Sequence, residues 1–328
     1  MNKKVIFVGD NHISDKQPAN RTDSYLEATL SKLNDCIELG KKHNVDAVIL
    51  LGDLFDRREE GPEARNGALK ILAKQREFPV YITVGNHDIN NSYELDQTSL
   101  GTLIEAGVLI KEDFVPDLGI AFAHFHPDLD MAIKSGFLTT QDAVIWSCHA
   151  SISDKKAHYE EYAVLFDTLH IHPNTKLVVS GHIHHPMRQE REDGKLFINP
   201  GAIGRRSANK DNLSRELKIL LLEYDLEGKI YIEEYLDLPS AKPYDQVFNM
   251  ELLAEVKVEK ESVKNFVKTV NQIKNNSWSH NTLEDKIENL KSIAKEKNLN
   301  DKIIDYTVKA IKYVNENSNK NTEDFELE

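Results

Sequence analysis

Several features that would assign the chain to a particular class of protein are scarce or missing. Its 328 residues include only two cysteines, Cys36 and Cys148, which lie far apart and offer no disulfide framework. No apolar run approaches the roughly 20 residues that a membrane-spanning helix needs. Near the N-terminus, the apolar run Val5–Val8 is broken by Gly9 and Asp10, which does not fit a signal peptide. We therefore expect a cytoplasmic chain with no membrane segment.

Positive charge is also in short supply. Lysine and arginine number 41 against 54 aspartate and glutamate residues, which gives a formal net charge of −13. Such a charge argues against a protein that coats nucleic acid through bulk electrostatics. A polyanion that binds this chain must therefore be held by local features.

Residues 1–240 alternate short apolar runs with helical patterns. Two longer runs, Leu217–Tyr224 and Ile230–Leu236, predict a β-hairpin. Helices are expected after a cap at Asp23 or Ser24 and over residues 63–74. Further strands are expected at Val5–Val8, Ala47–Leu51, Val80–Val84, Ile120–Ala123, Val144–Trp146, Leu177–Val179 and Leu196–Ile198. This order predicts the α/β class, as a layered α/β/β/α sandwich.

The pattern changes after Pro239 and Pro243. Residues 241–320 carry apolar stripes at helical spacing, which predict a small helical C-terminal module. The stripes either pack on one another or dock a partner or DNA. Residues 321–328 form an acidic tail that we expect to be disordered.

Five short motifs follow the expected strands. Because loops at strand ends converge in layered α/β folds, these motifs predict one site. They are GDNH at 9–12, GDLFD at 52–56, GNHD at 85–88, CH at 148–149 and GHIHH at 181–185. Together they offer oxygen and nitrogen donors without thiolate, which suits Mn²⁺, Fe or Zn²⁺ in a catalytic site. The candidate ligands are Asp10, His12, Asp53, Asn86, His149, His182 and His184.

The spacing within the motifs has physical reasons. On an extended segment, residues i and i+2 face the same way, so His182 and His184 can both point at one cluster. A glycine precedes Asp10, Asp53, Asn86 and His182, and it lets the backbone turn sharply so that ligands can crowd around small ions.

Two divalent ions at such a site would change the local charge. They bring four positive charges and the two aspartates return two negative ones, which leaves a site that attracts phosphate. Ions about 3.5–4 Å apart can share a hydroxide and orient a phosphate ester for in-line attack. The sequence thus predicts phosphate-ester hydrolysis with two divalent metal ions, most favourably Mn²⁺.

The ordered motifs resemble those of the calcineurin-like metallophosphoesterases. GDLFDR, the upstream Arg21 and Asp23, and GNHD resemble the SbcD-type DNA repair exonucleases within that superfamily. The resemblance covers roughly residues 1–236. Residues 237–328 depart from it, because they are shorter and more helical than the C-terminal part of a full-length repair nuclease.

The resemblance implies a role for each motif residue. One metal would be held by Asp10, His12, Asp53 and His184, and the other by Asp53, Asn86, His149 and His182, so that Asp53 bridges the two ions. His87 matches a catalytic histidine that binds no metal, and Asp56 lies where a helper for that histidine is found. Arg205 and Arg206 follow a strand in a loop that resembles one near the family site. They either donate to substrate phosphate or form a solvated basic pair.

The leading hypothesis is a metal-dependent DNA nuclease, either exonuclease or endonuclease, that belongs to an SbcCD-like repair or recombination complex. Its implied partners are DNA, an SbcC-like coiled-coil ATPase subunit and a second copy in a homodimer. One alternative is a phosphodiesterase or phosphatase for small molecules. Another is a metal-binding scaffold that acts through a protein partner.

Overall fold

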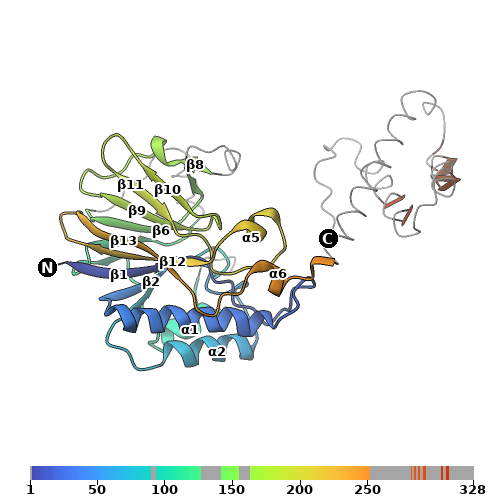
Figure 1. The fold of residues 1–328 in the computed structure, drawn as a ribbon, viewed down its shortest axis with the longest axis horizontal. Helices are drawn as coiled ribbons and strands as arrows, with labels where there is room; N and C mark the ends of the chain where they lie inside the picture. Colours follow the sequence, from blue (N-terminus) through green and yellow to red (C-terminus); the bar gives the residue numbers. More distant parts are fainter. Residues whose placement is uncertain are drawn as a thin grey trace. The chain divides into compact units, whose positions relative to one another are not determined.

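The computed structural model describes residues 2–89, 94–126, 142–154 and 163–251, together with a few positions between 282 and 309. The chain divides into two compact units, Met1–Phe248 and Asn249–Glu328. The expected helical module and acidic tail lie almost entirely outside the described residues, so both stay predictions. The first unit contains every motif, and its ribbon is shown in Figure 1.

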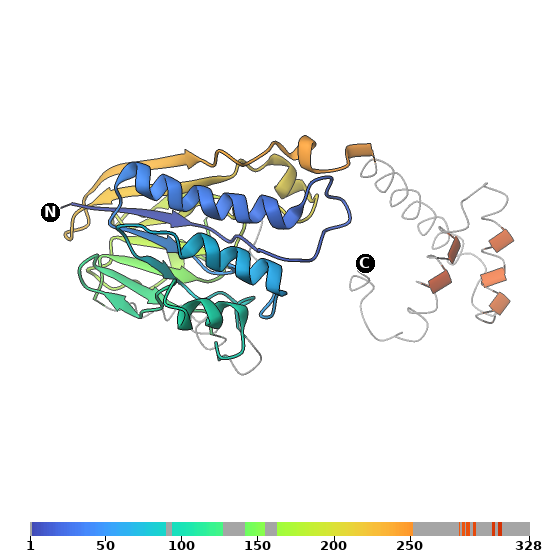
Figure 2. The ribbon, with the colours of Figure 1, turned by 90° about the horizontal axis from the view of Figure 1, so that it is seen from below.

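A five-stranded mixed sheet forms the first layer of this unit. Its strands, in sheet order, are β13 (Ile230–Asp237), β12 (Lys218–Tyr224), β1 (Lys3–Val8), β2 (Ala47–Leu50) and β3 (Val80–Ile82). β1 is parallel to β2 and antiparallel to β12. The helices α1 (Tyr25–His43), α2 (Pro62–Leu72) and α3 (Ser99–Glu105) pack against one face, as Figure 2 shows for α1 and α2.

A six-stranded sheet packs against the other face of the first. Its strands, in sheet order, are β10 (Met187–Glu190), β11 (Leu196–Asn199), β9 (Leu177–Gly181), β6 (Ile145–His149), β5 (Ile120–Ala123) and β4 (Phe114–Val115). A small pair of strands, β7 (Ile152–Ser153) and β8 (Val164–Leu165), and the 3₁₀ helix η1 (Phe166–Thr168) lie beside this sheet.

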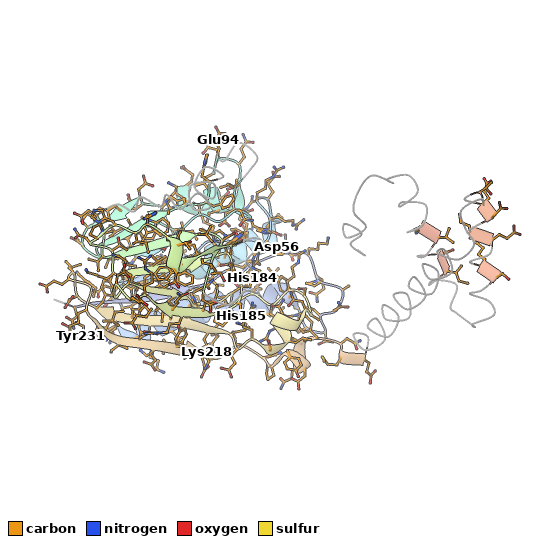
Figure 3. The ribbon with its side chains drawn as sticks, turned by 90° about the horizontal axis from the view of Figure 1, so that it is seen from above. Asp56, Glu94, His184, His185, Lys218 and Tyr231 are labelled. Atoms are coloured by element: carbon orange, nitrogen blue, oxygen red, sulfur yellow. The ribbon has the colours of Figure 1, made fainter. Side chains whose placement is uncertain are left out.

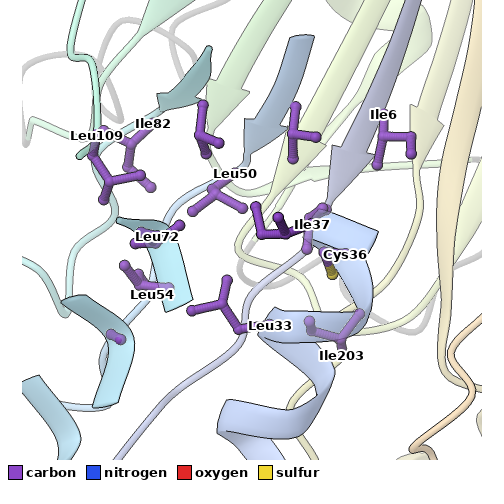
Figure 4. Close-up of a cluster of buried hydrophobic side chains, with 14 of the residues drawn as sticks. Ile6, Leu33, Cys36, Ile37, Leu50, Leu54, Leu72, Ile82, Leu109 and Ile203 are labelled. Atoms are coloured by element: carbon purple, nitrogen blue, oxygen red, sulfur yellow. The ribbon is translucent and has the colours of Figure 1, made fainter. Parts of the chain in front are cut away.

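Strand β1 shows why the layers form. Val5 and Phe7 point into the core between the two sheets, whereas Ile6 and Val8 point into the core beneath the helices. A strand that is buried on both faces needs a continuous apolar run, and β1 has one. Figure 4 shows Ile6 with residues of α1 and β2 in the helix-side core. The layered α/β sandwich expected from the sequence is confirmed.

Local signals also explain α1. The side chain of Ser24 accepts a hydrogen bond from the backbone N–H of Glu27, and Asn44 ends the helix in the left-handed conformation. Leu33 and Ile37 are buried on its inner face. The expected helix is therefore confirmed, with Ser24 rather than Asp23 as its cap.

All the strands expected from apolar runs are present, and β12 and β13 form the expected hairpin. The sequence did not predict β4, β7 and β8. Each of these strands has two residues, which is too short to show the alternating pattern of a strand. It also missed β10, which is largely polar and lies at a sheet edge. Among the described residues, no helix is long and apolar enough to cross a membrane.

The segment after β13 belongs to the first unit as far as Phe248. It includes the short helix α6 (Tyr244–Val247), and another short helix, α5 (Lys210–Ser214), precedes β12. The N–H of Thr22 donates to the carbonyl of Val247, and the ring of Phe248 packs under the guanidinium of Arg21. These contacts belong to the compact unit, which extends to Phe248.

Candidate metal centre

The candidate ligands lie where five strands end. β1, β2 and β3 of the first sheet and β6 and β9 of the second lead directly into them. Figure 3 shows His184 and Asp56 at one end of the unit and Tyr231 at the opposite end. The structure brings all the expected donors together: Asp10, His12, Asp53, Asn86, His149, His182 and His184.

One group of donors consists of Asp10, His12 and His184. The Nε2 atoms of His12 and His184 lie 3.0 Å apart. Asp10 Oδ2 lies 3.5 Å from Nε2 of His184 and 3.9 Å from Nε2 of His12. These three atoms surround a common point, as the ligands of one cation do.

The second group of donors includes Asn86, His149 and His182. Asn86 Oδ1 lies 3.0 Å from His149 Nε2 and 2.9 Å from His182 Nδ1. Asp53 lies between the groups, because its Oδ2 is 3.4 Å from His149 Nε2 and 3.8 Å from His12 Nε2. This is the position that a bridging carboxylate would take.

The donor set fits a pair of divalent cations. With metal–ligand bonds of about 2.1 Å, neighbouring ligand atoms are roughly 3–3.5 Å apart, close to the distances in both groups. The Nδ1–H of His149 donates to the carbonyl of Leu51 at 2.7 Å, which leaves the Nε2 lone pair facing the cluster. The hydrogen bond thus selects the tautomer that can bind a metal.

The backbone at the ligands is strained in a specific way. Three ligands have positive φ angles: 52° at His12, 47° at Asp53 and 78° at His182. Such conformations are unfavourable for these residues and persist only when the surrounding structure imposes them. Gly52 has a φ of 102°, and a Cβ there would lie 2.2 Å from Nδ1 of His149. The GD sequence is therefore required for close approach of the ligands.

The protonation states of three candidate ligands, Asp10, His12 and His182, favour cation binding. Burial lowers the pKa of His12 and of His182 to about 4, so both imidazoles are neutral. Burial opposes ionisation of Asp10, but the hydrogen bond of His184 and the charge of His149 outweigh it and lower the pKa to about 2. Burial also opposes protonation of His149, yet the charge of Asp53 raises its pKa to about 10. A cation would displace that proton.

His87 lies beside the two groups without belonging to the expected ligand set. Its backbone N–H donates to Asp53 Oδ1 at 2.9 Å, and its ring packs edge-on to that of His12. Its Nδ1 lies 2.6 Å from the carbonyl oxygen of Asp56 and donates to it. Nε2 is then the ring atom that can exchange a proton with a substrate.

The side chain of Asp56 has a different partner from the expected one. Its carboxylate accepts hydrogen bonds from Arg206, with a shortest distance of 2.6 Å, and lies 3.6 Å from Nδ1 of His12. The structure therefore places the contact between Asp56 and His87 on the main-chain carbonyl, not on the carboxylate.

Arg205 and Arg206 differ sharply in placement. The side chain of Arg206 is 40% exposed and lies on a cavity next to the centre. Arg205 is only 4% exposed, and its guanidinium donates to the carbonyls of Lys242 and Arg215. Of the two arginines, Arg206 alone is placed to donate to a substrate beside His87, and the expected contact of Arg205 does not fit its burial.

Two further residues support the centre, although the sequence reasoning gave them no role. Asp88 accepts hydrogen bonds from the N–H groups of Phe55 and Gly85, so it joins the loops after β2 and β3. Its place at the end of GNHD could have drawn attention to it. Arg215 donates to the carbonyl of His184 at 2.8 Å, but no motif in the sequence marks it.

A sequence model described as calcineurin-like phosphoesterase matches residues 3–186, which is more than half of the chain. The chain therefore belongs to the calcineurin-like phosphoesterase family. It is a metallophosphoesterase-type hydrolase with histidine and aspartate clusters that can hold metals. All the candidate ligands lie within the matched residues.

Several solved structures are similar to the chain at low identity. A conserved uncharacterized protein and predicted phosphoesterase from Streptococcus pneumoniae is 15% identical, with 72% of this chain and 98% of that chain covered and a TM-score of 0.26. The E. coli phosphoesterase Yfce is 14% identical, with coverages of 71% and 100% and a TM-score of 0.34. A dimetal phosphatase from Danio rerio is 12% identical, with coverages of 72% and 99% and a TM-score of 0.39. No curated protein matches the chain significantly.

Proposed function

We propose that the protein is a metal-dependent DNA nuclease of the SbcD type, which hydrolyses phosphodiester bonds at the candidate metal centre. The observation that carries this proposal is a cavity of about 600 Å³ that borders Asn86 and His87. Its charged lining is rich in basic side chains, namely Lys16, Arg57, Arg58 and Arg206, against the acidic Asp56 and Glu59.

The charge of this cavity matters because the whole chain is acidic. With a net charge of −13, the chain has no general attraction for nucleic acid, so a local basic surface has to provide it. Several cationic groups around one cavity suit a ligand with successive phosphates better than a single phosphate monoester. Lys16, Arg57 and Arg58 are all exposed. Arg57 is held by the buried Glu60 at 2.8 Å, and Arg58 lies 3.3 Å from the exposed Glu59.

The residues around the centre have separate chemical roles in this proposal. Divalent cations held by the candidate ligands would supply an activated water and polarise the phosphoryl oxygens. Arg206, oriented by Asp56, donates to a non-bridging phosphate oxygen. His87, oriented by the Asp56 carbonyl, protonates the leaving oxygen through Nε2.

DNA hydrolysis tests the proposal directly. Purified protein is expected to degrade labelled single- or double-stranded DNA with Mn²⁺ or Mg²⁺ and to lose that activity in EDTA. The double variant Lys16→Ala, Arg58→Ala should raise KM for DNA about tenfold. It should also reduce the slope of the logarithm of the binding constant against the logarithm of salt concentration by about one to two, because up to two phosphate contacts are lost. Its turnover of bis-p-nitrophenyl phosphate should change far less, because that ester carries a single phosphate group.

A matched control is the double variant Lys42→Ala, Lys70→Ala. Both lysines are exposed in the last turns of α1 and α2, at the end of the sandwich away from the metal centre. This variant should digest DNA normally. Rapid hydrolysis of small phosphate esters with no action on DNA would contradict the nuclease proposal and favour a small-molecule phosphodiesterase or phosphatase.

We also propose that residues beyond Phe248 dock an SbcC-like ATPase with a long coiled coil. The support comes from the sequence, where amphipathic stripes offer anchors at i, i+3 and i+4 to another helix. Truncation after Phe248 should leave hydrolysis of bis-p-nitrophenyl phosphate intact, since all candidate ligands lie before residue 185. The truncated protein should no longer bind the ATPase in a co-purification experiment.

The position of this truncation matters. A chain that stops at Leu238 would also lose the backbone N–H of Ser240 that donates to Asp35, and the carbonyl of Lys242 that accepts from Arg205. Such a chain would confuse a folding defect with a docking defect. If the chain truncated after Phe248 binds the ATPase as the full chain does, the docking proposal fails.

A further inference from the structure

A second cavity, of about 340 Å³, lies away from the metal centre. It is bounded by the first half of α1, by Arg205 and by the segment that joins β13 to α6. Figure 2 shows α1 alongside that segment, and the N–H of Ser240 donates to Asp35 of α1 at 2.7 Å. The lining contains no candidate metal ligand.

Buried cations gather at this cavity. Arg21, Lys32 and Arg205 are buried in its wall, and Arg215 is buried behind them. Among the described residues, their hydrogen-bond partners are mostly backbone carbonyls: Lys32 donates to Ile203 at 2.6 Å, and Arg205 donates to carbonyls of two other segments. Carbonyls satisfy the donors but do not neutralise the charges.

Among the described side chains that line the cavity, the acidic ones are Asp23 and Glu27. Asp23 forms a two-pronged ion pair with Arg21. Burial, and after it the charges of Arg21, Arg205 and Arg215, lowers the pKa of Lys32 to about 7. Burial and the neighbouring arginines also lower the pKa of Arg205 to about 10. Burial is the main cause of both shifts, and the neighbouring cations add to it; a bound anion would favour the charged form of each group.

Two buried polar groups at the cavity have no hydrogen-bond partner among the described residues. They are Nε of Arg205 and Oγ of Ser240. Buried donors are nearly always satisfied in folded proteins, and the residues that carry these two groups both line this cavity, which favours a ligand there that accepts hydrogen bonds. A guanidinium N–H and a hydroxyl beside an ammonium group are typical donors to phosphate.

We propose that this cavity binds a small anion with a phosphate group, either inorganic phosphate or a nucleoside monophosphate. The charges of the lining match such a ligand. Its basic side chains are Arg21, Lys32, Arg205 and Lys242, and its acidic ones are Asp23 and Glu27. The basic groups outnumber the acidic ones, so the lining is positively charged and a phosphate anion would supply the missing negative charge. The cavity volume is at the lower end of the range for small-ligand sites, about 300–1,000 Å³.

The test is a calorimetric titration of the full-length, metal-loaded protein with inorganic phosphate and, separately, with AMP. Ser240→Ala removes a donor that has no internal partner, so the fold should not be affected. It should weaken binding at the cavity about tenfold, the effect of one hydrogen bond to a charged group. Lys242→Glu reverses a charge at the exposed rim and should weaken the same binding by about threefold or more.

Lys42→Glu is the matched control, because Lys42 is exposed at the other end of α1. It should leave binding unchanged. Phosphate bound at the metal centre contributes equally in all these variants, so the component that Ser240→Ala and Lys242→Glu reduce belongs to the cavity. Tighter binding of AMP than of phosphate identifies a nucleotide as the occupant, and equal binding identifies the phosphate group alone. If neither variant weakens any binding component, the proposal is overturned and the cations serve only to hold backbone carbonyls.

Discussion

Replacing Asp53 by alanine is expected to remove both metal ions and, with them, phosphodiester hydrolysis. The Oδ2 atom of Asp53 lies within 4 Å of donor nitrogens in both ligand groups, 3.8 Å from His12 and 3.4 Å from His149. Both cations would therefore lose a negatively charged ligand at once. Because metal catalysis contributes several kcal/mol, we expect the rate to fall by a factor on the order of 10³ or more.

Elemental analysis of the purified Asp53→Ala variant checks this prediction, alongside turnover of bis-p-nitrophenyl phosphate. Asp117→Ala is the control, since Asp117 is an exposed aspartate outside the motifs. It should keep about two ions per chain and full activity. Full occupancy of both ions in Asp53→Ala would rule out the bridging role. Loss of one ion only would assign Asp53 to a single metal.

Under the nuclease proposal, replacing His87 by glutamine is expected to keep both ions but to slow hydrolysis of DNA by about 10²–10⁴-fold, the usual contribution of a general acid. The metal should be retained because His87 contacts Asp53 through its backbone N–H, which the substitution does not remove. Glutamine can still donate a hydrogen bond to the Asp56 carbonyl, but its amide group cannot give up a proton as the Nε2 atom of the imidazole can.

Comparing hydrolysis rates for substrates with different leaving groups distinguishes a general acid at His87 from a residue that only supports the structure. A p-nitrophenolate leaves readily without protonation, whereas the alkoxide of a DNA chain needs a proton. His87→Gln should therefore damage DNA hydrolysis far more than hydrolysis of bis-p-nitrophenyl phosphate. His185→Gln, at an exposed histidine directly after a candidate ligand, is the control and should be normal with both substrates. Equal loss with both esters would show that His87 only supports the shape of the centre.

Much of the candidate site could be predicted from the sequence because its donors depend on local features. Apolar runs define the strands, and a glycine next to a carboxylate or histidine allows the turn that follows each of them. Since β1, β2 and β3 are parallel, their carboxyl ends meet at one edge, and donors placed just after them converge. The positions of Asp10, Asp53 and Asn86 follow from these rules.

The basic residues near the site could not be assigned in this way. Arg205 and Arg206 are neighbours in sequence and have the same chemistry. Only the fold decides that one is buried against carbonyls of distant segments and the other pairs with Asp56. No pattern near Lys32 or Arg215 predicts burial, because their partners lie in another loop of the fold.

The difference has a physical cause. Strand, helix cap and glycine turn are set by interactions within a few residues of the chain, so the sequence alone determined the layered fold and the order of the ligands. The partner of a long charged side chain is set by which loops meet in three dimensions. Tertiary structure alone therefore decided that Asp56 holds His87 through its carbonyl and Arg206 through its carboxylate, and that a cluster of buried cations borders a second cavity.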